Sequence, residues 1–322
     1  MKKLSIRIVA VLICICMSSA AAWAAELLVP VGQVIGMELS DHSMTVASFD
    51  EAMGRQARMA GLCVGDKILS IDGKTITSAE DVRGALSSSK GIISMTVSRG
   101  GKEETLRLRP QITADGPKLG VYLKQGVTGI GTVTYYDPDT GCFGALGHGV
   151  NSGDGKLLDM VTGQVYRANV VAVKMGKVGE PGQLRGAVTE PECLGQLWRN
   201  TGRGVFGQCE SGWEGEAIPV ASAEEVCVGE ATILSTVCDD GVREYSVEIL
   251  KIYPKSKKEG RNLMLKITDP ELLAITGGIV QGMSGSPIIQ NGKLIGAVTH
   301  VLVNDPTRGY GIFIENMLDA AA

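Results

Sequence analysis

The residues best suited to chemistry lie in a glycine-framed turn near the C-terminus. The turn Gly282-Met283-Ser284-Gly285-Ser286-Pro287 sets one serine between two glycines, just before the hairpin sequence PIIQNGKLIGAV. A serine attacks a carbonyl carbon only when a base takes its proton and N–H groups stabilise the oxyanion. Because glycine permits a backbone that aims amides into one pocket, we predict Ser284 as a nucleophile and Gly282 and Ser284 as oxyanion donors. Ser286, the rival nucleophile, precedes a proline and is interpreted as structural.

The base for this serine must come from three histidines. His42 lies in the polar sequence SDHSM and is interpreted as a solvated loop residue, and His300 as a core or edge residue of the strand after Ser284. His148 lies in CFGALGHGV, where glycines 144, 147 and 149 predict a sharp loop at a strand end. His148 is therefore the candidate base, although these residues alone leave open whether the loop serves catalysis or only the turn.

The elements that must position these residues are short strands. Between Val121 and Ile314, apolar segments alternate with Gly, Asn and Asp turns, which favours a closed barrel or a pair of barrels. The chain has 43 glycines and only 4 phenylalanines, so its cores depend on Val, Ile and Leu. We predict a mainly β protein, with a linker at residues 111–120 and a second domain at residues 121–322.

Residues 27–110 have their own pattern of turns. Asp72-Gly73 predicts a hairpin, Ser78 a helix N-cap with Asp81 in the capping box, and Gly100-Gly101 a second hairpin. This order resembles a bacterial PDZ domain. The resemblance implies that a peptide adds as a strand beside a helix while a backbone loop holds its carboxylate. The matching loop here is Ile35-Gly36-Met37-Glu38.

The N-terminus and the composition limit where the protein can act and what it can bind. Residues 1–25 have a basic start, an apolar stretch and the small residues Ala22-Trp23-Ala24, which predicts a signal peptide or signal anchor. A net charge of −4 argues against nucleic-acid binding. The six later cysteines include no CxxC pair, so we expect no zinc site, while export permits disulfides among them.

Two long blocks resemble one protein family. Residues 126–150 read GVTGIGTVTYYDPDTGCFGALGHGV, and residues 267–301 read ITDPELLAITGGIVQGMSGSPIIQNGKLIGAVTHV. The turn around Ser284 is similar to the nucleophile turn of chymotrypsin-like proteases. The two blocks, behind a PDZ domain and an export segment, resemble the sporulation stage IV B peptidases of endospore-forming bacteria. The resemblance implies a chymotrypsin-like double β-barrel, whereas HtrA-type proteases carry their PDZ modules after the protease domain.

The resemblance also implies roles for individual residues. Ser284 would be the nucleophile, His148 the general base and Asp269 the orienting carboxylate, with no metal or cofactor. The residues themselves predict Asp269 as a helix N-cap followed by Pro270 at the first helical position. The alternative carboxylates are Asp154, Asp239 and Asp240.

The resemblance implies a function in sporulation signalling. The enzyme would be secreted from the forespore into the space between the forespore and mother-cell membranes, cleave the exposed domain of a membrane-embedded regulator, and cleave itself near its N-terminus. Its PDZ domain would recruit substrate through C-terminal or internal peptide segments, or bind a second copy of the chain. The alternatives are a non-catalytic exported PDZ adaptor and a general quality-control protease of the HtrA kind.

Overall fold

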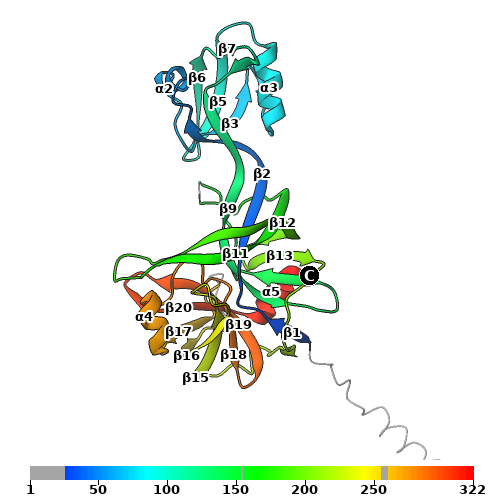
Figure 1. Ribbon diagram of the computed structural model, residues 1–322, viewed down its shortest axis with the longest axis vertical. Coiled ribbons are helices and arrows are strands. Elements are labelled where there is room, and N and C mark those ends of the chain that lie inside the picture. Colours follow the sequence, from blue (N-terminus) through cyan, green and yellow to red (C-terminus); the bar gives the residue numbers. More distant parts are fainter. Residues whose placement is uncertain (1–25, 154, 255–259) are drawn as a thin grey trace, which may run out of the picture.

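The computed structural model describes residues 26–153, 155–254 and 260–322. Its strands form two barrels that lie against each other, and a PDZ domain stands apart from them at the end of two long strands (Figure 1). The predicted export segment, residues 1–25, lies outside the described residues. No helix within the described ranges has the length and apolar character needed to span a membrane.

The first barrel is closed by the pairing of β9 with β2. Its strands run in the order β9, β10, β13, β12, β11 and β2, and β1 and β14 extend the sheet beyond β9. Val29, Ile35, Val133, Phe143 and Val205 belong to its core. The strands are β1 (Leu27–Pro30), β2 (Val34–Phe49), β9 (Val121–Tyr136), β10 (Cys142–Ala145), β11 (Thr162–Lys174), β12 (Gln183–Thr201), β13 (Gly204–Cys209) and β14 (Ile218–Pro219).

The second barrel is closed by strands in the order β15, β16, β17, β20, β19 and β18. Asn291 and Gly292 make the predicted hairpin turn between β18 and β19, with φ of 53° and 72°. The elements are β15 (Gly229–Ser235), β16 (Arg243–Ile252), β17 (Leu263–Ile267), α4 (Pro270–Thr276), β18 (Pro287–Gln290), β19 (Lys293–Leu302), β20 (Asp305–Phe313) and α5 (Ile314–Ala321). The chain is therefore mainly β, with the predicted double barrel.

The PDZ domain contains both predicted hairpins and the predicted cap. Ser78 accepts the Asp81 amide at 3.1 Å, and residues 72–73 and 100–101 take positive φ in their turns. The domain's own elements are α2 (Arg55–Met59), β3 (Lys67–Ile71), β4 (Lys74–Thr75), α3 (Ala79–Ser88), β5 (Ile93–Arg99), β6 (Lys102–Leu108), β7 (Gln111–Thr113) and β8 (Gly116–Lys118).

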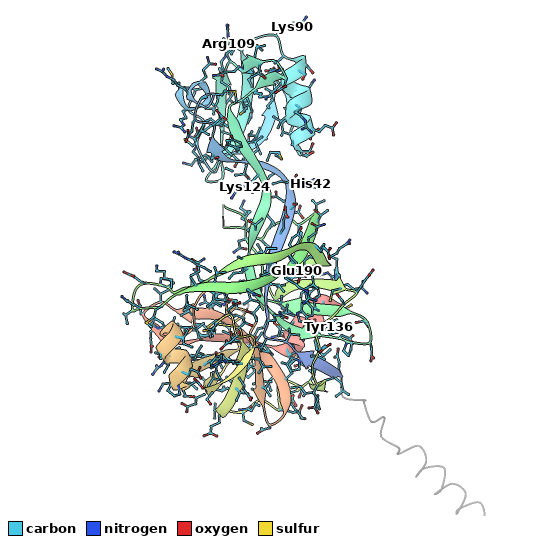
Figure 2. The ribbon with its side chains drawn as sticks, in the orientation of Figure 1. His42, Lys90, Arg109, Lys124, Tyr136 and Glu190 are labelled. Carbon is cyan, nitrogen blue, oxygen red and sulfur yellow. The ribbon has the colours of Figure 1, made fainter. Side chains whose placement is uncertain are left out.

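The boundary predicted at residue 27 is wrong. Residues 34–39 of β2 pair with β9 and β11 and pack in the first barrel, whereas residues 44–49 of the same strand pair with β9 and β3 in the PDZ domain. Strand β9 runs back in the same way from Val121 to Tyr136. The PDZ domain is thus inserted between β2 and β9 of the first barrel, and in Figure 2 His42 and Lys124 mark these two strands between the domains.

The linker predicted at residues 111–120 is also wrong. Residues 111–118 form the β7–β8 hairpin, and Leu119 is buried in the PDZ core. Gly120 has φ of +70°, and a Cβ there would lie 2.4 Å from the Met53 carbonyl oxygen. Two paired strands, not a polar tether, therefore join the domains. The cysteines of the described chain are free thiols in this structure, at positions 63, 142, 193, 209, 227 and 238.

Candidate active site

The turn around Ser284 depends on its glycines. Gly282 and Gly285 have φ of +101° and +99°, values that side-chain-bearing residues rarely adopt. A Cβ on Gly285 would lie 2.0 Å from the Thr132 carbonyl oxygen, so the turn packs directly on the backbone of β9. The glycines are thus needed both for the backbone conformation and for the approach to the first barrel.

The amides of this turn divide into bonded and unbonded groups. Those of Met283, Gly285 and Ser286 donate to backbone carbonyls at 2.8 to 3.1 Å. Within the described part of the chain, the amides of Gly282 and Ser284 donate to no backbone oxygen, and both residues line the same pocket. This is the arrangement an oxyanion hole requires, because its donors must be free to bind a developing negative charge.

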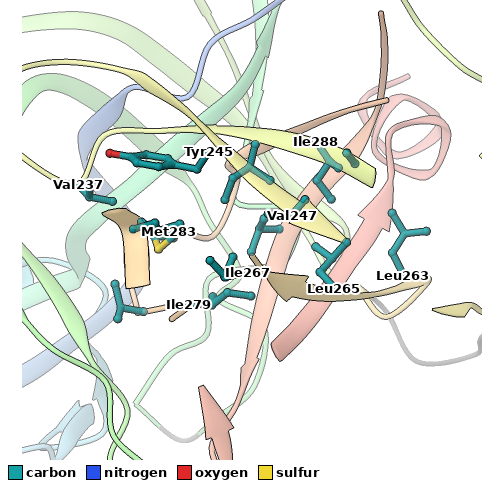
Figure 3. Packing of buried hydrophobic residues seen from close by; sticks show 14 of the residues in the cluster. Val237, Tyr245, Val247, Leu263, Leu265, Ile267, Ile279, Met283 and Ile288 are labelled. Atoms are coloured by element: carbon teal, nitrogen blue, oxygen red, sulfur yellow. The ribbon is translucent and has the colours of Figure 1, made fainter. Parts of the chain in front are cut away.

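Met283 anchors the turn in the second barrel. Its side chain is fully buried among residues of β16, β17 and β18, including Val247, Ile267 and Ile288 (Figure 3). Because the two residues that flank Met283 supply the unbonded amides, this anchor fixes the part of the chain that carries them.

His148 stands on the sharp loop that its glycines predicted. β10 ends at Ala145, and Leu146 and Gly147 follow with φ of 70° and 66°. The Nδ1 of His148 lies 3.0 Å from the Gly149 carbonyl oxygen. Since a carbonyl only accepts, Nδ1 carries the proton and Nε2 keeps its lone pair. Burial lowers the pKa of His148, and the Gly149 contact partly opposes that shift, so the imidazole is neutral at pH 7.

Ser284 and His148 line one pocket of about 520 Å³ between the two barrels. Its wall combines the first barrel, through β2, β9 and the His148 loop, with the second barrel, through the Ser284 turn and the end of β19. The predicted nucleophile, base and oxyanion donors are therefore brought together, although they lie more than 130 residues apart in sequence.

His300 lines the same pocket. Its position in the strand had predicted a core or edge residue instead. Burial, with the nearby His148 and Arg261, lowers the pKa of His300 to about 4. Its Nδ1 is buried and has no hydrogen-bond partner among the described residues. A neutral second imidazole thus lies beside the candidate base.

Asp269 does not lie in this pocket. It is the N-cap of α4, where Oδ1 accepts the Leu272 amide at 2.9 Å and Oδ2 accepts the Ser246 amide at 3.3 Å. His300 lies beside Gly260, which precedes β17, whereas Asp269 follows the other end of that strand. Five strand residues span about 16 Å. The structure therefore does not bring Asp269 to the histidines, and the role implied by the resemblance is replaced by the helix cap that the residues predicted.

Neither Asp239 nor Asp240 takes the orienting role beside His148. Asp239 and Asp240 are exposed, and Asp240 pairs with Arg243. Asp154 lies outside the described residues. No carboxylate of the described chain is among the residues that line the pocket, so the Gly149 carbonyl is the group that fixes the His148 tautomer.

The peptide-binding loop predicted at Ile35, Gly36, Met37 and Glu38 is wrong. These residues lie in β2 of the first barrel, paired on one side with β9 and on the other with β11, so they form no loop of the PDZ domain. Gly36 is required because a Cβ there would lie 2.8 Å from a methyl group of Val188. Ordinary sheet packing therefore accounts for this glycine.

The rival nucleophile Ser286 and the third histidine, His42, both lie outside the candidate active site. Ser286 is fully buried, and its hydroxyl donates to that of Ser235 at 3.0 Å. His42 is exposed on β2 between the domains (Figure 2). Neither residue lines the pocket that contains Ser284.

Comparison with known families gives two matches along the chain. The model described as SpoIVB peptidase S55 matches residues 116–318, more than half of the chain, and a PDZ domain model matches residues 57–99. A curated relative, the putative zinc metalloprotease R01501 of Rhizobium meliloti, is 34% identical over 100 residues. That match covers 31% of this chain and 26% of the relative, so the chain spans about a quarter of the relative's length.

Solved structures with similar folds include proteases and a PDZ domain. The active form of the Rv3671c protease from M. tuberculosis is 15% identical, with coverage of 61% of this chain and 75% of that one, and a TM-score of 0.35. The PDZ domain of an SdrC-like protein from Listeria monocytogenes is 22% identical, with coverage of 27% and 92% and a TM-score of 0.23.

Proposed function

Because the chain belongs to the SpoIVB peptidase S55 family, we propose that it is an exported serine endopeptidase of sporulation signalling. It cuts the exposed domain of a membrane-embedded regulator, and it cuts itself near its N-terminus. The observation that supports this most strongly is the single pocket lined by Ser284, by His148 with a free Nε2, and by the unbonded amides of Gly282 and Ser284. These are the groups that acyl transfer requires.

The proposed reaction begins at the Ser284 hydroxyl, which in this structure donates to the Thr299 carbonyl at 2.8 Å. Rotation about the Cα–Cβ bond turns it toward His148, and Oγ then bonds to the substrate carbonyl carbon while its proton passes to Nε2. The Gly282 and Ser284 amides bind the oxyanion. The C–N bond breaks as His148 protonates the leaving amine, and water, deprotonated by the same base, hydrolyses the acyl-enzyme.

No carboxylate among the described residues lines the pocket in which the imidazolium forms during this cycle. The Gly149 carbonyl accepts a hydrogen bond from the Nδ1–H of His148 in both the neutral and the protonated ring, and this bond keeps the ring oriented. His300 stays neutral because its pKa is about 4, so it does not repel the charge on His148. The proposed unit is therefore Ser284 and His148, supported by a backbone oxygen.

The PDZ domain is proposed to recruit protein segments at the edge of β9 next to Gly120. Residues 121–125 pair with β2 on one side, and no described strand pairs with their other side. Helix α3 lies beside β8, which directly precedes β9. An extended peptide added to this edge would lie beside a helix, which is how PDZ domains bind. A segment of a second copy of the chain could add to the same edge.

The proposed location is the space between the forespore and mother-cell membranes. It rests on the family and on the export pattern of residues 1–25. Self-processing tests the function: N-terminal sequencing of the full chain should find a shortened form, and Ser284→Ala and His148→Ala should each prevent it. Equal processing in both variants would show that another protease makes the cut.

A further inference from the structure

Thr132, near the end of β9, contacts both halves of the candidate active site. Its fully buried hydroxyl donates to the Gly282 carbonyl at 2.7 Å, and its amide donates to the Ser284 carbonyl at 3.1 Å. Its own carbonyl accepts the Leu146 amide at 3.2 Å, two residues before His148. One residue of the first barrel thus binds the nucleophile turn and the base loop.

The two carbonyls held by Thr132 bracket the peptide group that supplies an oxyanion donor. The Ser284 N–H belongs to the peptide between Met283 and Ser284, and the peptides on either side of it are the ones that Thr132 holds. The Met283 carbonyl accepts the Ser286 amide at 3.0 Å. Because a trans peptide points its N–H opposite to its C=O, these bonds keep the Ser284 amide turned toward the pocket.

We propose that Thr132 is a positioning residue for catalysis: its hydroxyl holds the oxyanion donors, and its backbone keeps Ser284 in register with His148. This inference rests on the proposed function. Oxyanion donors act only at the position of the developing charge. Loss of the hydroxyl therefore slows the chemical step more than it weakens binding.

Thr134 provides a matched control on the same strand. It lies two residues along β9, and it is also fully buried. Its hydroxyl has no hydrogen-bond partner among the described residues. Thr→Val at either position keeps the side-chain shape and removes one buried hydroxyl, but only at Thr132 does it remove a bond to the nucleophile turn.

The experiment measures fluorophosphonate labelling of Ser284 in the full chain, as a maximal rate and a half-saturating concentration, beside thermal melting. Thr132→Val should lower the maximal rate about tenfold to a hundredfold, with the half-saturating concentration within about twofold of wild type. Thr132→Ser, which restores the donor, should recover most of the rate, and Thr134→Val should label as wild type does.

A folded Thr132→Val that labels as fast as wild type overturns the inference. Equal losses in Thr132→Val and Thr134→Val also overturn it, because packing would then explain both. If Thr132→Val does not melt cooperatively, Thr132→Ala is measured with the same expectation. If the wild-type chain does not label at Ser284, the proposed function itself is overturned. If the wild-type chain labels and the Thr132 variants label equally fast, only the inference about Thr132 is overturned.

Discussion

The imidazole rings of His148 and His300 lie with their centroids 5.4 Å apart and their planes inclined by 44°. Burial lowers the pKa of both rings, and that of His300 falls to about 4. Two cations this close would repel each other, so the pair takes up at most one proton beyond its neutral state. That proton goes to His148, because the Gly149 carbonyl accepts from its Nδ1–H, whereas the Nδ1 of His300 has no hydrogen-bond partner among the described residues.

This relationship predicts the pH dependence of the enzyme. The base must be neutral to act, so the rate falls as pH falls through the His148 pKa, which burial sets below its ordinary value of about 6.5. The labelling rate of Ser284, measured from pH 4 to 8, should therefore have its acid midpoint below about 6.5. A carboxylate beside His148 would raise that pKa, so a midpoint above about 7 would contradict a site in which only the Gly149 carbonyl orients the ring.

Asp269→Asn should leave catalysis nearly intact. Asparagine caps a helix about as well as aspartate, so the free energy of unfolding should change by less than about 1 kcal/mol. Labelling should stay within about threefold of wild type, because Asp269 lies outside the pocket. Asp269→Ala is the paired variant and should lower stability by about 1 kcal/mol. A hundredfold loss of rate in a normally folded Asp269→Asn would return this residue to the catalytic unit.

Much of the site could be predicted from local sequence, because its backbone is set by local chemistry. The left-handed residues at 146, 147, 282 and 285 lie where the glycine pattern indicated sharp turns. The Gly149 carbonyl, His300 and Thr132 could not be assigned in the same way, since their roles depend on which strands meet across the two barrels. Thr132 and Thr134 lie on either side of the apolar Val133 near the end of β9, but that pattern does not reveal which hydroxyl is bonded.

The domain boundary was wrong for a similar reason. A glycine at position 36 fits both a PDZ loop and a crowded sheet, and the choice depends on Val188, more than 150 residues away. The hairpins and helix cap of the PDZ domain were predicted because each is closed by neighbours in sequence. The insertion of this domain between β2 and β9 rests on long-range pairing, which local patterns do not encode.

Ser286→Ala separates the two serines of the turn. The variant removes a buried hydrogen bond to Ser235, so its stability should fall by about 1 to 2 kcal/mol. The fluorophosphonate should still attach to Ser284 at close to the wild-type rate. Urea unfolding gives the first quantity and labelling gives the second. A folded variant that no longer labels would make Ser286 part of the catalytic unit.

Substrate breadth distinguishes signalling from quality control. A signalling protease gains rate by recruiting its substrate at a second surface, which raises the effective concentration of the cleavage site. Unfolded casein lacks that contact, so mass spectrometry of a casein digest should find few, slowly cut sites. Rapid cleavage at many sites would favour a general quality-control protease.

The proposed function depends on Ser284 being an activated nucleophile. The most direct measurement is fluorophosphonate labelling of the full wild-type chain followed by peptide mapping, with Ser284→Ala and His148→Ala as controls whose folding is checked by circular dichroism and melting. We predict label on Ser284 alone in the wild type and none in either folded variant. Absence of label on a folded wild-type chain would contradict this role of Ser284 and favour a non-catalytic PDZ adaptor, and label that persists in Ser284→Ala would show a different nucleophile.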